Sequence, residues 1–130
     1  MTIFSKIIAG EITCYKVAEN SDFFAFLDIN PIAKGHVLVV PKKEEDYLFD
    51  LDDKTLGDMM IFSKRVAKAM KKAIPCKRIG VTVIGLEVPH AHIHLVPITK
   101  ESDIHFNQPK QKLSPEEFKE IAAAIAENFE

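Results

Sequence analysis

Apolar residues near the start of the chain recur at the spacing of one helical face. Residues 3–9 follow this pattern and Gly10 comes directly after them as a C-terminal cap, so we expect a short opening helix. The next apolar runs are shorter and are separated by turn-forming Asn, Asp, Pro and Gly residues. They predict three strands, joined by short connections into an antiparallel meander: residues 13–19, 23–28 and 36–40.

A longer amphipathic helix follows the meander. Between Leu56 and Ile74 apolar residues recur about every 3.6 positions, Asp52 or Asp53 is available as the N-cap, and Pro75 ends the pattern. Lysine and arginine residues gather in its C-terminal half, where positive charge suits the helix dipole. We interpret this basic side as a solvated face rather than as a binding patch.

The remaining pattern completes an α+β fold. Two β-rich segments, residues 78–84 and 88–98, are separated by a bend at residues 85–87. A capping box at Ser114–Glu117, with proline at the first helical position, begins a C-terminal amphipathic helix that extends to Phe129. We therefore predict an antiparallel sheet of about five strands, with the main helix and the C-terminal helix packed on it.

Length and charge narrow the classes of protein and partner. A chain of 130 residues has the size of one domain, and we expect residues 1–130 to form a single one. Its 47% hydrophobic and 28% charged residues are typical of a globular protein. The net charge of −2 provides no basic field for extended nucleic acid, although a small phosphate ligand is compatible with it.

Cysteine content and hydropathy bear on the compartment. Cys14 and Cys76 are too few for the disulfide framework of a secreted domain, which favours a reducing environment with free thiols. The sequence has no long apolar segment typical of a signal peptide or a membrane span. The expectation is a cytoplasmic protein without membrane attachment.

Three of the five histidines stand at alternating positions within the last β-rich segment. His90, His92 and His94 would share one face of a strand, while Ala91 and its alternating neighbours take the other, buried face. A row of imidazoles offers a neutral nucleophile toward phosphorus, together with neighbours that stabilise charge or exchange protons. The middle residue, His92, has a histidine on both sides.

Two other interpretations of this row stay open. At about 3.3 Å per residue, His90 and His94 lie roughly 13 Å apart along a strand, so one zinc ion cannot bind all three imidazoles. Two neighbours such as His92 and His94 could still share an ion with a third ligand from elsewhere. Alternatively, the row is a polar, solvent-facing side of the strand, although such faces usually mix several polar residue types.

Three motifs together resemble the histidine triad (HIT) family, in particular its Hint-like branch. The run His-x-His-x-His followed by two apolar residues, at 90–96, resembles the signature of that family. Residues 3–12 are similar to the start of Hint-like proteins, and residues 26–31 and 35–43 to their nucleotide-binding strands. The resemblance covers about residues 2–98, so residues 99–130 form a C-terminal extension outside it.

The resemblance implies catalytic roles for four histidines. His92 would form a nucleotidyl-histidine intermediate, and His94 would contact the phosphate. His90 and His36 would orient the nucleophile or relay protons to it. For His36 an alternative is a satisfied core histidine at the start of a strand.

The resemblance also implies a nucleotide-binding set. Asp28 would bind the ribose hydroxyls, because a carboxylate accepts two hydroxyl donors well, although an aspartate before Asn30 could equally be a turn residue. Ile29, Gly85 and Glu87 complete the expected set of nucleotide-binding residues.

The chain also departs from the Hint-like pattern. Many such proteins hold a structural zinc with two cysteines and a later histidine, in addition to the first triad histidine; here those places carry Thr2, Ser5 and Glu44. We therefore predict no metal and no cofactor. Leu86 replaces a family glutamine before the triad, which affects contacts to the leaving group. His94 stands where uridylyltransferase-like members have glutamine, which favours hydrolysis over transfer.

Two functions from different classes follow from these observations. The first is a hydrolase that cleaves a nucleoside 5′-monophosphate, with a purine base, from a phosphoramidate or related conjugate through a covalent intermediate on His92. The second is a purine-nucleotide-binding module with little catalysis that acts through a protein partner. The resemblance further implies a homodimer, which the main helix and the adjoining strand could support.

Overall fold

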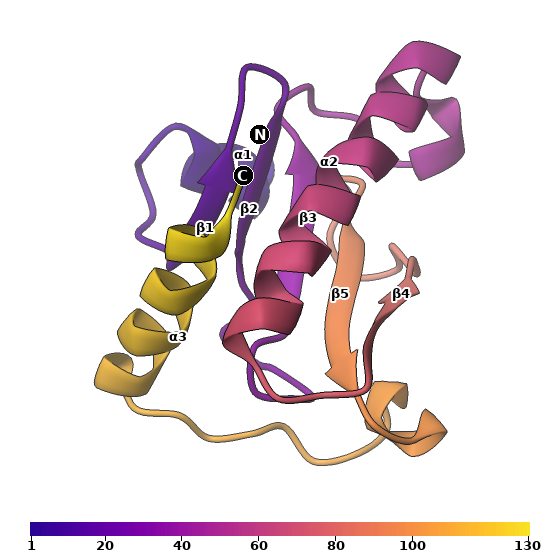
Figure 1. The fold of residues 1–130 in the computed structure, drawn as a ribbon. Coiled ribbons are helices and arrows are strands. Elements are labelled where there is room, and N and C mark those ends of the chain that lie inside the picture. Colours follow the sequence, from indigo (N-terminus) through magenta and orange to yellow (C-terminus); the bar gives the residue numbers. More distant parts are fainter.

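A five-stranded antiparallel sheet forms the centre of the protein. The computed structural model describes residues 1–130 (Figure 1). The strands lie in the order β1-β2-β3-β5-β4, so the meander predicted at the start of the chain is confirmed and β4 forms an outer edge. Their bounds are Lys16–Glu19 (β1), Phe23–Leu27 (β2), Val37–Pro41 (β3), Arg78–Thr82 (β4) and Ile93–Ile98 (β5).

The two central strands are covered on both faces. All five residues of β2 and of β3 are buried, and the strands pair in an unbroken register in which Ala25 lies opposite Val39. Before β2, the side-chain oxygen of Asn20 accepts hydrogen bonds from the backbone N–H groups of Asp22 and Phe23 at 3.0 and 2.8 Å. Such an Asx turn reverses the chain and explains why the polar run before β2 ends β1.

The two long helices cover one face of the sheet (Figure 1). Helix α2 (Asp53–Ala73) lies over β3 and β5, and α3 (Pro115–Asn128) lies beside it over β1 and β2. The predicted capping box at the start of α3 is present, since Ser114 and Glu117 exchange side-chain-to-backbone hydrogen bonds. A core of 21 buried residues lies between the helices and the sheet, and the predicted α+β architecture is confirmed.

The opposite face of the sheet has a smaller apolar cluster beneath α1 (Ile3–Ile8). Phe4 of this short helix packs edge-on against Phe26 of β2, with 5.6 Å between ring centroids. Gly10 follows the helix with a φ of 82°, a conformation that glycine adopts without steric cost, as expected of a C-terminal cap. The histidines lie on this side of the sheet, whereas Ile93 and Leu95 of β5 join the main core.

The histidine-bearing strand is shorter than predicted. Residues 88–92 are irregular and β5 begins only at Ile93, so His90 and His92 precede the strand. Gly85, with a φ of 75°, turns the chain away after β4, and the N–H of Ala91 donates to the carbonyl of Glu45 at 2.6 Å. This segment bonds to the connection after β3 and does not continue the pairing with β4. The prediction that His90, His92 and His94 share one face of a single strand is therefore wrong for His90 and His92, which lie outside the strand.

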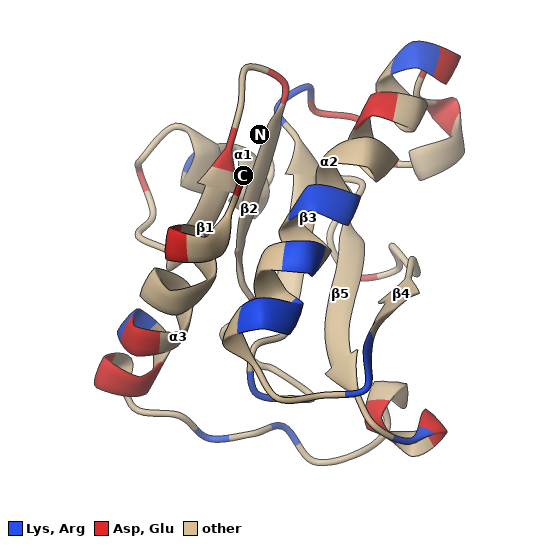
Figure 2. Cartoon of the chain, in the orientation of Figure 1, with Lys and Arg blue, Asp and Glu red and all other residues tan.

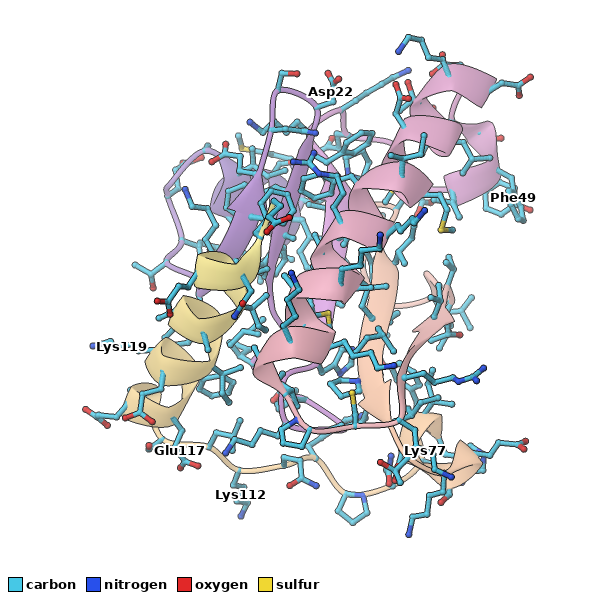
Figure 3. All side chains as sticks on the ribbon, in the orientation of Figure 1. Asp22, Phe49, Lys77, Lys112, Glu117 and Lys119 are labelled. Carbon is cyan, nitrogen blue, oxygen red and sulfur yellow. The ribbon has the colours of Figure 1, made fainter.

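Charged side chains lie mainly on the outside of the molecule. Lysines and an arginine follow the exposed side of α2 (Figure 2), and Arg65 packs 4.6 Å above the ring centroid of Phe129 while donating to the carbonyl of Glu130. Figure 3 shows Lys112 and Lys119 pointing away from the protein. These features agree with a solvated basic face. None of the helices combines the length and apolar character needed to span a lipid bilayer.

Candidate active site

Four histidines gather where β3 and β5 meet. His94 lies on β5, between Leu38 of β3 and Thr82 of β4, while His36 directly precedes β3. All four imidazoles are buried, including those of His90 and His92 in the irregular segment. The rings of His92 and His94 lie 4.9 Å apart, and those of His36 and His94 lie 5.2 Å apart.

A carbonyl group fixes the proton of His92. Nδ1 of His92 lies 2.8 Å from the carbonyl oxygen of His90, which can only accept, so Nδ1 carries a hydrogen. In the neutral ring Nε2 then holds the lone pair. Phe4 packs against the ring at 5.1 Å between centroids and restricts its rotation. The short loop between the two histidines thus fixes the orientation of a ring whose neutral form has a free lone pair on Nε2.

A donor fixes the protons of His36 and His94 in the same way. The backbone N–H of Ile32 donates to Nδ1 of His36 at 3.3 Å, so the neutral ring carries its hydrogen on Nε2. Nε2 in turn donates to Nδ1 of His94 at 2.9 Å. Neutral His94 therefore carries its remaining N–H on Nε2 and can donate it to a ligand.

Burial keeps both of these imidazoles neutral near pH 7. It lowers the pKa of His36 to about 4, and the charges of Lys110 and His92 act in the same direction. Burial also lowers the pKa of His94 to about 3, with further lowering by His36 and His92. His94 is thus a neutral imidazole, rather than a cation, with an Nε2–H that is free to donate.

His90 points away from this group. Its Nε2–H donates to the carbonyl of Pro41 at 2.8 Å, and its Nδ1 accepts from the hydroxyl of Thr2 at 2.8 Å. Both ring nitrogens are occupied by structural partners, so His90 acts on His92 through its carbonyl oxygen and not through its ring.

The place of the Hint-like structural zinc holds a hydrogen-bonded cluster instead. Glu44 accepts from the hydroxyl of Ser5 and from the backbone N–H of Thr2, the latter at 2.8 Å, and these bonds lower the pKa of its carboxyl group. The Nδ1 lone pair of His90, which would bind a metal, accepts from Thr2. A structural zinc site favours thiolate and imidazole ligands. This cluster offers two hydroxyls, one carboxylate and an imidazole whose lone pair is already occupied, so it does not fit such a site.

A second potential metal group lies beside the triad. One ligand atom each from Asp28, His36 and His94 can be chosen so that all lie within 4.8 Å of one another. However, the N–H of Ile32 occupies the Nδ1 lone pair of His36 and leaves the hydrogen on Nε2, the nitrogen that faces the group. The arrangement suits a hydrogen-bond relay better than metal ligation.

A pocket of about 550 Å³ lies in front of His92 and His94. This volume is within the range of small-molecule sites. Its walls are largely apolar and include Ile3, Phe4 and Ile7 from α1. Six residues expected at the site line it: Asp28, Ile29, Gly85, Glu87, His92 and His94. His36 and His90 lie behind this lining.

Asp28 fits both of its expected roles. Its Oδ1 accepts from the backbone N–H of Asn30 at 2.8 Å, as in a turn. Its Oδ2 lies 3.7 Å from Nε2 of His36, and the residue borders the pocket. One carboxylate oxygen thus shapes the turn, while the other remains available to a ligand.

Two residues of the pocket wall come from the C-terminal extension. Phe106 packs against the ring of His94 at 4.8 Å between centroids, and Lys110 borders the same pocket. Sequence reasoning missed both, because a single aromatic residue and one lysine in a polar connection carry no periodic or motif signal. The sequence placed the whole of residues 99–130 outside the family resemblance.

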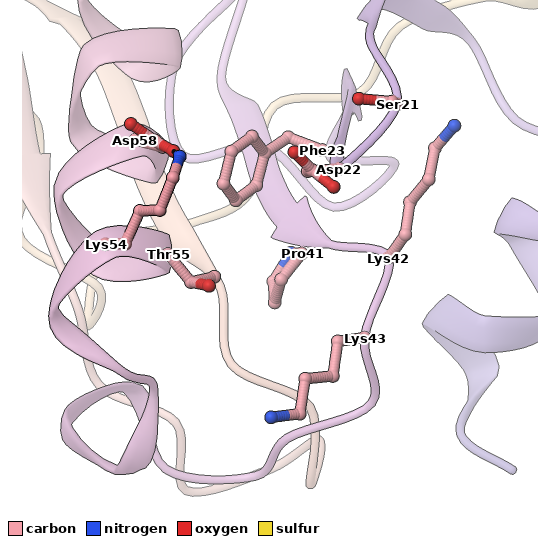
Figure 4. A pocket seen from close by; sticks show the side chains of 9 residues that line it. All are labelled: Ser21, Asp22, Phe23, Pro41, Lys42, Lys43, Lys54, Thr55 and Asp58. Atoms are coloured by element: carbon pink, nitrogen blue, oxygen red, sulfur yellow. Dashed lines mark hydrogen bonds and ion pairs between the residues drawn. The ribbon is translucent and has the colours of Figure 1, made fainter.

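Another cavity, of about 340 Å³, lies at the other end of the sheet (Figure 4). It is lined mainly by polar residues from the β1–β2 turn, the end of β3 and the first turns of α2. Lys54 and Asp58, which border it, pair with each other at 2.7 Å, and no histidine lines it. The chemistry described above therefore belongs to the histidine-lined pocket.

The fold and the site together define an α+β protein with an imidazole cluster at the base of a ligand-sized pocket. The sequence model that defines the HIT domain family matches residues 9–101 of this chain. The chain belongs to the HIT family, as its sequence motifs indicated.

Similar proteins align with this chain far outside residues 9–101. An uncharacterized HIT-like protein of Borreliella burgdorferi is 36% identical, over 98% of this chain and 97% of its own length. The adenosine 5′-monophosphoramidase Hnt1 of Schizosaccharomyces pombe is 34% identical, over 95% of each chain. The crystal structure of a HIT-like protein from Bartonella henselae, described as involved in cell-cycle regulation, has a TM-score of 0.84 and 34% identity, over 98% of this chain and 96% of that one. These matches include most of the C-terminal extension.

Proposed function

We propose that the protein hydrolyses conjugates of a purine nucleoside 5′-monophosphate, phosphoramidates in particular. The observation that carries the proposal is the proton arrangement at the pocket: the carbonyl of His90 holds the hydrogen of His92 on Nδ1, leaving the Nε2 lone pair for attack. The similarity to an adenosine 5′-monophosphoramidase supports this substrate class. HIT membership and this relative favour nucleotide hydrolysis in general.

The proposed reaction has two displacement steps. Nε2 of His92 bonds to phosphorus while the bond from phosphorus to the amine breaks, giving a nucleotidyl-histidine. Water then attacks phosphorus, releases the nucleoside monophosphate and restores His92. Over both steps one water supplies the new oxygen on phosphorus and the proton on the amine. Nucleophilic catalysis of this kind divides one difficult displacement into two easier ones.

The surrounding residues take supporting roles in this proposal. His94 donates its Nε2–H to the phosphate oxygens, on which negative charge develops during attack. His36 holds His94 in the required tautomer. Asp28 accepts the ribose hydroxyls with the oxygen that faces the pocket, and Ile29, Gly85 and Glu87 border the nucleoside. The apolar wall from α1 suits the face of a purine base.

One feature favours the alternative of a nucleotide-binding module. Leu86, which replaces the family glutamine, is 89% exposed at the rim of the pocket, where an apolar side chain suits a protein partner better than a leaving group. Binding of AMP without release of AMP from any phosphoramidate or dinucleoside polyphosphate would support this function over hydrolysis.

A homodimer and a reducing compartment complete the proposal. β4 has an unpaired edge on which Val81 is exposed, and Met60 and Ile61 of α2 are also exposed apolar residues that a second copy could cover. Cys14 and Cys76 are both free thiols, which suits the cytoplasm.

Steady-state hydrolysis of adenosine 5′-phosphoramidate tests the proposed function. His92→Ala should lower AMP release by on the order of 10³-fold or more, because the nucleophile is lost. His105→Ala is the matched control, since His105 is exposed and does not line the pocket. Turnover by His92→Ala equal to that of the control would rule out His92 as the nucleophile.

A further inference from the structure

The connection between β5 and α3 returns to the active-site pocket. Residues 105–112, which we call the strap, follow the short helix η2 (Glu101–Ile104) and run below the sheet toward α3 (Figure 1). The strap is fastened to the turn after β2, because the N–H of Gln111 donates to the carbonyl of Pro31 at 2.8 Å. This turn also contains Asp28, so the strap and the proposed ribose-binding residue are held together.

The strap places an ammonium group beside the triad. Phe106 packs edge-on against His94, with 4.8 Å between centroids, and against His36, with 5.9 Å. Nζ of Lys110 lies 5.4 Å from the centroid of the Phe106 ring and donates to the carbonyl of Phe106 at 3.4 Å. Phe106 therefore acts as a platform that holds the Lys110 side chain at the pocket.

The charges of the pocket show why this ammonium matters. The residues that line it include two carboxylates, those of Asp28 and Glu87, and a single lysine, Lys110. His94 and His36 are neutral near pH 7, and the nearby charge of Lys110 contributes to lowering the pKa of both. Without Lys110, a bound phosphate would meet two carboxylates and no lysine or arginine among the residues that line the pocket.

We propose that Lys110 is the cationic contact for the substrate phosphate, an inference that rests on the proposed nucleotide function. The flexible stem of lysine lets its ammonium turn from the carbonyl of Phe106 to a phosphate oxygen, where a charge-assisted hydrogen bond is stronger than one to a neutral carbonyl. The chain thereby uses a residue outside the matched domain, residues 9–101, to bind the anionic part of its ligand.

Calorimetric titration with AMP and with adenosine tests this role, because the two ligands differ only in the phosphate. Lys110→Met should weaken AMP binding by about 5- to 20-fold and leave adenosine binding unchanged. Lys110→Arg should retain most of the affinity for AMP. Lys112→Met is the matched control, because Lys112 points away from the protein two residues further along the strap.

Three results would overturn the inference. If wild-type protein prefers AMP over adenosine and Lys110→Met keeps that preference, the phosphate contact lies elsewhere. If Lys110→Met weakens both ligands equally, Lys110 supports the pocket and does not contact the phosphate. If wild-type protein binds neither ligand, the proposed nucleotide function itself fails, and the role of Lys110 with it.

Discussion

At the scale of single residues, the site works by fixing where each imidazole carries its hydrogen. A carbonyl accepts from His92 and a backbone N–H donates to His36, so each ring has one permitted neutral tautomer. Burial then keeps His36 and His94 neutral. In its neutral form, His92 therefore has the lone pair on Nε2, next to a neutral His94 that can donate its N–H.

Because Phe106 packs against the ring of His94, we expect it to contribute to the burial that lowers the pKa of His94. Phe106→Ala should raise the pKa of His94 from about 3 toward its ordinary value, because burial is the largest cause of the lowering and the variant exposes the ring. Titration of the histidine ring protons by NMR measures the shift. Phe49→Ala is the control, since Phe49 is exposed and does not line the pocket. If the pKa of His94 is unchanged in Phe106→Ala, residues other than Phe106 exclude water from the ring, and the expectation is wrong.

The sequence predicted that the histidines belong to one candidate site, but it did not predict their surroundings. The alternating run at 90–94 pointed to a shared site, and Asp28, Ile29, Gly85 and Glu87 border the same pocket. The tautomers could not be predicted, since they depend on Ile32 and Pro41, which no motif links to the triad. The burial of the rings also depends on Phe4 and on the strap, which approach from opposite ends of the chain.

At the scale of elements, local signals predicted the helices better than the ends of the strands. Gly10 and the capping box before α3 act within a few residues, so the sequence around each is sufficient to specify it. The start of β5 depends instead on a contact between Ala91 and Glu45, which are far apart in the sequence. The strap is held by similar long-range contacts, which explains why its position at the pocket was not predicted.

The hydrogen-bonded cluster at the start of α1 links this helix to the triad. Thr2→Val preserves the shape of the side chain but removes the donor to the buried Nδ1 of His90. We expect the free energy of unfolding to fall by about 1–3 kcal/mol, since an unsatisfied buried acceptor is costly. Urea denaturation measures this change.

Thr99→Val provides the matched control for this variant. Thr99 is exposed, and its side chain makes no hydrogen bond within the protein, so the substitution should change stability by less than about 0.5 kcal/mol. If Thr2→Val is no less stable than Thr99→Val, the Thr2–His90 bond does not hold α1 to the site.

At the scale of the whole molecule, the two faces of the sheet differ: one carries the main hydrophobic core and the other the candidate site. The face beneath α2 and α3 carries the main core, whereas the face beneath α1 carries the imidazoles and the pocket. β4 has one free edge, and Val81 is half exposed there. An open strand with apolar neighbours is a surface at which two copies can associate.

The proposed homodimer predicts a measurable mass in solution. Light scattering after size-exclusion chromatography should give twice the chain mass of 14.6 kDa. Val81→Lys should shift the protein toward the monomer, because it places a charge in the apolar contact. Ala123→Lys on the exposed side of α3 is the control and should remain dimeric. A wild-type monomer at micromolar concentration would refute the proposed dimer.

The most direct test of the central claim, attack by His92 followed by attack by water, is the stereochemistry at phosphorus. One diastereomer of a P-chiral adenosine 5′-phosphorothioamidate would be hydrolysed by the wild-type protein in water enriched in heavy oxygen, and the configuration of the product determined. Each in-line displacement inverts phosphorus, so two steps through nucleotidyl-His92 predict overall retention. Overall inversion would show that water attacks the substrate directly, and would contradict the covalent role of His92.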